Sequence, residues 1–212
     1  MNTRHTAKLG LAGLVTAAVA GTTLAAPAHA QESSAEPGTR SLAKVLGADR
    51  GFDRNWHDYD ILEKAVLTVL KAKPSSPVSV LAKGNQRVTA FLPTDAAFRA
   101  LVKDLTGTQR KTERGTFRAL ARIADVDTVE SVLLYHVIVG KTLGAKKIVK
   151  RDGKAIKTAL GATITVKVKG KKVILVDQDR NDRNPRVVMV NINQGNKQIA
   201  HGIDRVLRPI DL

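Results

Sequence analysis

Apolar residues in the first half of the chain recur with the period of an α-helix. Between Asp58 and Pro74 they return every three or four positions, which predicts an amphipathic helix. Asp58 or Asp60 is the start signal, because acidic side chains favour the first turn, and Pro74 cannot continue the helix. The apolar positions of this helix are Ile61, Leu62, Ala65, Val66, Val69 and Leu70.

The following segment predicts a strand and two more helices. Residues 88–92 are a short apolar run typical of a strand, and Thr94 directly after it can cap a helix. A third helix is expected to begin near Asp127, with Glu130 three residues on, and to end at Gly140. The core-facing positions of these two helices are Ala97, Phe98 and Leu101, then Val129, Val132, Leu133 and His136.

In the second half the period changes from 3.6 to two. Ile164, Val166 and Val168 alternate with polar residues, and a turn at Gly170 leads into the apolar run 173–176, which predicts a hairpin. The runs 187–192 and 203–207 are interpreted as further strands. Helices followed by strands are the order expected of an α+β domain.

The first 50 residues differ from the rest. Residues 1–30 have a basic start, an uncharged run and the ending Ala-His-Ala, a pattern typical of a secretory signal peptide cleaved after Ala30. A retained transmembrane helix is the weaker interpretation, because the run is barely long enough and rich in small residues. Residues 31–50 are interpreted as a flexible leader, with a short helical pattern only at 41–46, and residues 51–212 as the folded domain. We therefore expect a secreted protein, extracellular or loosely attached to the cell surface, without a transmembrane helix after cleavage.

Composition narrows the possible chemistry. The chain has 212 residues, 35 Lys and Arg against 19 Asp and Glu, a net charge of +16 and no cysteine. Because residues 1–30 carry only two of the basic residues, the charge excess belongs to the chain that follows them. The lack of cysteine excludes disulfides, thiolate metal sites and a cysteine nucleophile. A hydrophobic content of 43% is typical of a globular domain.

Three sequence blocks resemble the signature blocks of fasciclin (FAS1) domains. They are VTAFLPTDAAFRAL at 88–101, LYHVIVGK at 134–141 and IAHGIDRVLRP at 199–209. Their order and spread identify the chain as a member of this family, similar to bacterial secreted single-domain proteins. The resemblance implies a wedge-shaped β-sandwich with packed helices and a role in cell adhesion or the extracellular matrix. It also makes Tyr135 and His136 candidate partner-binding residues, while Gly202 stands where the family usually has an apolar residue.

Candidate metal ligands are weak. His136 and His201 lack a third ligand at suitable spacing, so hydrogen bonds inside the fold are the favoured interpretation. Asp177, Asp179 and Asn181 imitate the start of a calcium loop, but the required later glycine and glutamate are missing and arginines interleave. Residues 177–186 are therefore interpreted as a solvated hairpin loop. We expect no metal, no cofactor and, without any recognisable catalytic motif, no enzymatic activity.

A high density of positive charge is the clearest sequence feature outside these three blocks. Only Asp152 is acidic in a segment with eleven basic residues, namely Lys141, Lys146, Lys147, Lys150, Arg151, Lys154, Lys157, Lys167, Lys169, Lys171 and Lys172. Lys167 and Lys169 are expected on the exposed strand face, opposite the valines. The partner-binding candidates here are Lys167, Lys169, Lys171 and Lys172. The alternative is a merely solvating surface, because charge runs are usually only that.

These observations lead to a hypothesis about function. We expect a non-catalytic adhesion or matrix protein whose partner is a surface protein, an anionic polysaccharide or a cell-envelope polymer. Sequence-specific nucleic-acid binding is not expected, because no aromatic residue follows Tyr135 to stack on bases. A small-ligand binding or transport module of the same fold is the alternative, and an undescribed hydrolase a third. The oligomeric state stays open.

Overall fold

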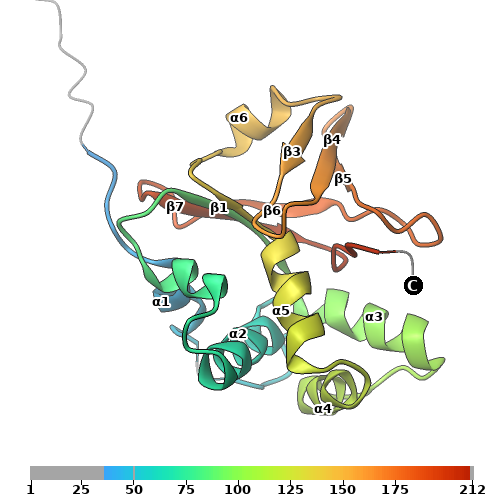
Figure 1. The fold of residues 1–212 in the computed structure, drawn as a ribbon. Coiled ribbons are helices and arrows are strands. Elements are labelled where there is room, and N and C mark those ends of the chain that lie inside the picture. Colours follow the sequence, from blue (N-terminus) through green and yellow to red (C-terminus); the bar gives the residue numbers. More distant parts are fainter. Residues whose placement is uncertain (1–35, 50, 211–212) are drawn as a thin grey trace, which may run out of the picture. The chain divides into compact units, whose positions relative to one another are not determined.

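A computed structural model describes residues 36–49 and 51–210, so the expected signal peptide lies outside the described residues. The described part contains helices in its first half and mainly strands in its second (Figure 1). The elements up to residue 135 are α1 (Leu42–Leu46), α2 (Asp60–Ala72), the 3-10 helix η1 (Pro77–Ala82), β1 (Val88–Pro93), α3 (Asp95–Thr106), α4 (Glu113–Ile123) and α5 (Val126–Tyr135). The remaining ones are β2 (Val137–Val139), α6 (Ala145–Val149), β3 (Ala155–Lys157), β4 (Thr163–Lys169), β5 (Lys172–Val176), β6 (Val187–Ile192) and β7 (Gln198–Ile203).

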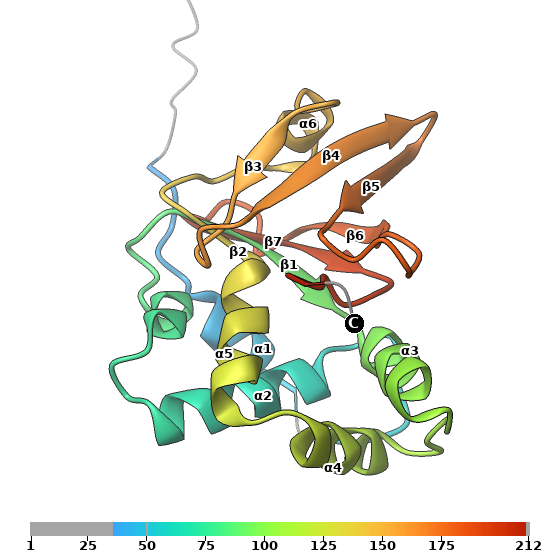
Figure 2. The ribbon, with the colours of Figure 1, turned by 45° about the vertical axis from the view of Figure 1, so that its right-hand side comes forward.

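The strands form two sheets. The first has the order β2-β1-β7-β6, in which β1 and β7 run parallel and the other neighbours antiparallel. The second is the antiparallel meander β3-β4-β5. Figure 2 shows the helices α2 to α5 on one side of the first sheet and the second sheet on the other. The α+β class is thereby confirmed.

Strand β1 lies at the centre of this arrangement. All six of its residues are buried, because both of its faces are covered. Val88, Ala90 and Leu92 pack with the helices, whereas Phe91 belongs to the core between the two sheets. The inter-sheet core contains residues from both sheets and from α6, namely Phe91, Ile138, Ile148, Ile156, Ile164, Val166, Leu175 and Ile203.

Several expected boundaries agree with the structure, but those of the third expected helix do not. Helix α2 begins at Asp60, and the Thr94 hydroxyl caps α3 by accepting from the amide of Ala97. The third expected helix is shifted, because Asp125 rather than Asp127 is its cap, accepting from the Thr128 amide at 2.8 Å. This helix ends at Tyr135, not at Gly140, since residues 137–139 pair with β1 as strand β2.

Other elements follow from tertiary contacts. The sequence prediction missed α4, whose Thr112 cap accepts from the Gly115 amide, and also η1, α6 and β3. The last strand is Gln198–Ile203 instead of 203–207, because it pairs in parallel with β1 over those residues. Val206 and Leu207 are buried without being in a strand.

The fold begins before residue 51. The Gly38 amide donates to the carbonyl of Gly195, and the Lys197 amide donates back to Gly38, both at 2.8 Å. Leu42 in α1 is fully buried in the helical core, where its amide donates to the side chain of Gln198. The described part of the expected leader is therefore docked on the domain. No helix in residues 36–49 and 51–210 is long and apolar enough to cross a membrane.

Candidate functional site

Tyr135 lies inside the domain. It is the last residue of α5, it is fully buried, and its hydroxyl donates to the carbonyl of Thr163 in β4 at 2.9 Å. Burial raises the pKa of its hydroxyl to about 12, and the negative charge of Asp177 adds to the effect. The side chain therefore connects the helical layer to the second sheet.

His136 is held at the end of the same helix. The Leu207 amide donates to its Nε2 at 2.9 Å, so the proton sits on Nδ1, which donates to the Val132 carbonyl at 2.7 Å. Burial lowers the pKa of the ring to about 4, so it is neutral at physiological pH. His201 is buried as well and hydrogen-bonds the carbonyl of Leu143. Both histidines are thus satisfied by the backbone, as the favoured interpretation predicts.

We call residues 134–141 the Tyr-His block, and within it the side chains of Tyr135 and His136 offer almost no surface to a partner. Tyr135 is 0% exposed and His136 is 3% exposed. A partner could touch these rings only if the core opened. Within the described residues, their contacts make them part of the scaffold, and the lysine candidates are the ones left at the surface.

Four lysines share the outer face of the β3-β4-β5 sheet. Register places Lys169 directly opposite Lys172 and puts Lys167 on the same face, while Lys157 extends it onto β3. Lys171 lies in the turn between β4 and β5. We call these five exposed residues the basic sheet face: Lys157, Lys167, Lys169, Lys171 and Lys172. The valines between them, Val166 and Val168, point to the opposite side.

The charges of this face are not neutralised by the domain. Of the eleven basic residues between Lys141 and Lys172, ten are exposed and Arg151 is half-buried. Within residues 36–49 and 51–210, none of the eleven forms an ion pair with a carboxylate. Next to Lys169 and Lys172 lies a surface hollow of about 540 Å³. It is also lined by Asp182 and by two arginines that pair with Asp204, namely Arg183 and Arg186. Among the described residues, the lysines of the basic sheet face are therefore exposed and have no carboxylate partner.

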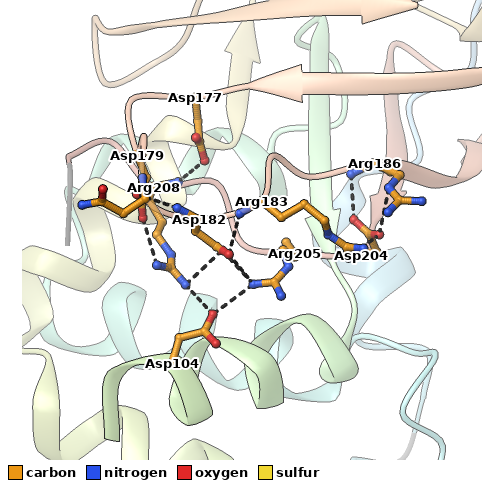
Figure 3. Close-up of polar contacts among 10 residues, drawn as sticks. Asp104, Asp177, Asp179, Asp182, Arg183, Arg186, Asp204, Arg205 and Arg208 are labelled. Atoms are coloured by element: carbon orange, nitrogen blue, oxygen red, sulfur yellow. Dashed lines mark hydrogen bonds and ion pairs between the residues drawn. The ribbon is translucent and has the colours of Figure 1, made fainter. Parts of the chain in front are cut away.

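The loop after β5 differs from the basic sheet face, because several of its charged side chains are paired within the domain. Its expected role as a solvated hairpin loop is wrong, because Asp179 is 4% exposed and binds Arg208, itself 6% exposed, at 2.9 Å. Arg208 also contacts Asp104 of α3, and Arg205 binds Asp182 at 2.7 Å (Figure 3). Alternating arginines and aspartates thus anchor the loop to α3 and to the C-terminal segment.

The calcium-like aspartates are engaged in this network. The Arg208 amide donates to Asp177 at 2.9 Å, and burial raises the pKa of Asp177 to about 6. Burial would also raise the pKa of Asp179, but the amides of Asn181 and Asp182 and the Arg208 guanidinium outweigh it and lower that pKa. Arginine therefore supplies the positive charge that a calcium ion would bring.

An apolar cavity of about 370 Å³ lies among helices α2 to α5. It is lined mainly by aliphatic and aromatic side chains, among them Leu62, Val69, Phe98, Leu101, Phe117 and Val132. A cavity of this size and chemistry suits a small apolar molecule.

A cluster of carboxylates that the sequence pattern does not predict lies at the N-terminal ends of α2, α3 and α4. Asp60, Asp95 and Glu113, the first residues of α2, α3 and α4, lie with oxygen atoms within 4.8 Å of one another. All three are at most 2% exposed. Burial and neighbouring carboxylates raise the pKa of Asp60 to about 6 and of Asp95 to about 8. The density of acidic residues between 49 and 60 is the sequence signal that marks this region.

Comparison with known proteins identifies the family. A family model described as the fasciclin domain matches residues 64–209, more than half of the chain. The chain belongs to the fasciclin domain family. Its Tyr-His block and third block thus place FAS1 signature residues in the inter-sheet core and on β7. Position 202 of the third block is a glycine for a local reason, because a Cβ there would collide with the hydroxyl of Tyr59.

A solved structure shares the fold. It is a FAS1 domain pair from the insect cell adhesion molecule Fasciclin I, similar with a TM-score of 0.56 and 17% sequence identity. The likeness covers 81% of this chain and 51% of the domain pair, so the chain spans about half the length of that protein. None of the curated proteins matches this fasciclin-domain chain.

Proposed function

We propose that this fasciclin-domain protein is a secreted, non-catalytic adhesion protein that attaches to anionic envelope or matrix polymers through the basic sheet face. Family membership supports the adhesion role, and the known FAS1 domain pair comes from a cell adhesion molecule. The signal-peptide pattern of residues 1–30 supports secretion. The observation that carries the partner class is the one-sided charge of the exposed, unpaired lysines.

The chemistry of the face favours repeated negative charges over a specific small ligand. Lysine ammonium groups attract phosphate or carboxylate as point charges, whereas bidentate recognition requires arginine. Lys169 and Lys172 are directly opposite each other across the hairpin, where like charges repel unless an anion lies between them. A flexible anionic polymer can run along the face and contact several lysines at once. Tyr135 and His136 support the sheet from inside and take no direct part in the contact.

Co-sedimentation with cell envelopes of the producing organism tests this proposal. The purified protein should sediment at low NaCl and be released as NaCl rises, because such contacts are screened over about 10 Å at 0.1 M salt. Changing Lys167, Lys169, Lys171 and Lys172 to Gln should abolish sedimentation at low salt. The matched control removes the same charge from exposed lysines elsewhere: Lys71, Lys83, Lys103 and Lys111 to Gln.

Two results would refute the basic sheet face as the attachment site. One is equal loss of binding in the hairpin variant and in the control variant, which would assign the effect to net charge alone. The other is binding that persists at high salt, which would point to an apolar or covalent contact.

The apolar cavity favours a second candidate function, binding of a small apolar molecule. A neutral fluorescent probe such as N-phenyl-1-naphthylamine should brighten with the wild-type protein. Val132→Phe, which places a ring in the cavity, should remove that signal. Leu67→Phe is the control, because Leu67 is 50% exposed on α2 and outside the cavity lining. An unchanged signal with Val132→Phe would eliminate the cavity as the binding site.

A further inference from the structure

The carboxylate cluster at the start of α2, α3 and α4 has more negative charge than its surroundings satisfy. We call it the acidic pocket and define it by Asp58, Asp60, Asp95 and Glu113. Asp60, Asp95 and Glu113 are 2%, 0% and 1% exposed. One oxygen of Asp60 and both oxygens of Glu113 are buried without a hydrogen-bond partner, whereas Asp58 and Asp95 share a hydrogen bond between their own carboxyl groups. Burying a polar group without a partner destabilises the fold, and more so when the group is charged, so we expect a binding partner for these oxygens.

The nearby backbone does not provide the missing charge. The Ile61 amide donates to one oxygen of Asp95 at 3.0 Å, and the remaining side-chain contact of Asp95 is with another carboxyl group, that of Asp58. Three helix N-termini converge on the pocket, but each brings only about half an elementary charge. The raised pKa of Asp95, about 8, shows that these carboxyl groups lack nearby positive charge. The neighbouring side-chain charges that shift the pKa values of the pocket residues most are themselves carboxylates, including Asp49 and Asp53 at the rim.

We propose that the acidic pocket binds one hard divalent cation of the calcium class. Among the described residues, the candidate ligand atoms that converge there are carboxylate oxygens, without the nitrogen or sulfur ligands that zinc and copper prefer. Three overlapping triads have ligand atoms within 4.8 Å of one another, namely Asp49–Asp58–Asp60, Asp53–Asp58–Glu113 and Asp60–Asp95–Glu113. Ca²⁺ takes about six to eight oxygen ligands in flexible geometry, whereas Mg²⁺ is usually bound by one or two carboxylates and keeps several waters, so a pocket with this many carboxylates suits Ca²⁺ better.

The pocket has an entrance. A hollow of about 310 Å³ is lined by Asp49, Asp58 and Asp60 together with Leu46 and Tyr59. Asp49 is exposed and Asp58 is half-buried, so negative charge leads from the surface to the buried carboxylates. The bound cation would join the segment before α2 to the starts of α3 and α4. This site is independent of the basic sheet face, which lies on the second sheet.

Terbium luminescence gives a local test, because Tb³⁺ occupies calcium sites and is excited by a nearby indole. Trp56 is the single tryptophan of the chain, and its carbonyl accepts from the Ala96 amide next to Asp95. Protein stripped with EDTA should show tryptophan-sensitised Tb³⁺ emission that Ca²⁺ displaces and Mg²⁺ displaces poorly. Asp60→Asn and Glu113→Gln should each weaken Tb³⁺ binding at least tenfold. Asp127→Asn, a change at a side chain that is 78% exposed, is the matched control and should bind normally.

Thermal unfolding separates cation binding from a purely structural role. Ca²⁺ should raise the midpoint of the wild type above its value in EDTA, because a ligand that binds the folded state stabilises it. Asp60→Asn and Glu113→Gln should lose this shift and melt higher than the wild type in EDTA, because each removes an unpaired buried carboxylate. Asp53→Asn, an exposed rim variant that keeps an acceptor for the Asn55 amide, covers the case in which the buried variants do not fold. It should weaken Tb³⁺ binding several-fold.

Two outcomes would overturn the proposal. The first is a wild-type midpoint that is the same in Ca²⁺ and in EDTA, together with no sensitised emission. The second is emission that persists unchanged in the pocket variants, which would place the bound ion elsewhere.

Discussion

The Tyr-His block and the basic sheet face contact opposite sides of one strand. Tyr135 donates to the backbone of Thr163 from inside the domain, whereas Lys167 and Lys169 of the same strand β4 extend into solvent. On the sequence alone, both regions are candidate partner contacts. Because side chains alternate across a strand, one sheet can use its inner face for packing and its outer face for binding. The difference teaches that motif residues and contact residues need not coincide.

The two regions also differ in whether their ionisable side chains carry a charge. His136 is kept neutral by burial, since desolvation penalises the protonated ring. The lysines stay hydrated, so a dense row of like charges costs little in water and remains available to a partner. Changes to the first region should therefore alter stability, and changes to the second should alter binding.

The largest expected effect is on the free energy of unfolding of Tyr135→Ala. Removing this fully buried ring leaves a cavity between the sheets, at a cost of about 4 kcal/mol. Lys169→Ala on the other side of the sheet should change stability by less than about 0.5 kcal/mol. Urea denaturation of both variants measures the contrast, and similar losses in the two would contradict the division between inner and outer face.

The next effect is a dependence of stability on pH that originates at His136. The unfolded ring binds a proton near pH 6.5, whereas the folded ring does so only near pH 4. Stability is therefore fully present above pH 6.5 and falls as the pH drops through this window, by about 3 kcal/mol in all.

Comparison with His136→Gln isolates that contribution, because other buried groups titrate equally in both proteins. The stability advantage of the wild type over the variant should shrink between pH 6.5 and pH 4. If the stability difference between the two proteins stays constant across this range, His136 is accessible to protons in the folded state. The proposed difference in charge state between His136 and the lysines would then be wrong.

The smallest effect concerns repulsion on the basic sheet face. Lys169→Glu replaces a like-charged pair with Lys172 by an attractive one, which should stabilise the hairpin by about 0.5 kcal/mol at low salt. The gain should vanish at high salt because both side chains are exposed. Lys141→Glu is the control, since Lys141 lies outside the hairpin. A gain of equal size in both would assign the effect to net charge.

Much of the fold was accessible from local pattern. The Thr94 cap, the start of α2 and the β4-β5 hairpin follow from side-chain chemistry within a few residues, and the structure confirms them. The exposure of Lys167 and Lys169 follows from alternation along a single strand. Strand β2 does not follow in this way, because the three residues after His136 become a strand only by pairing with β1.

The candidate sites also divide into those that the sequence reveals and those that only tertiary contacts create. The density of lysines is a property of the sequence, and so is the resemblance of three blocks to FAS1 domains. The acidic pocket is not, because Asp95 and Glu113 are far from Asp60 along the chain and meet only when three helix starts converge. The Asp179–Arg208 pair arises the same way, from a loop and a C-terminal segment that fold onto each other.

The sequence by itself determined the family, the helical and strand periods and the sign of the surface charge, because these depend on residue identity and short-range spacing. Only the tertiary structure decided which charged and aromatic groups are desolvated. Burial depends on contacts between distant segments, and it turned Tyr135 and His136 into supports of the sheet and left Lys167 and Lys169 in water. The same burial turned a set of ordinary helix-start carboxylates into the acidic pocket.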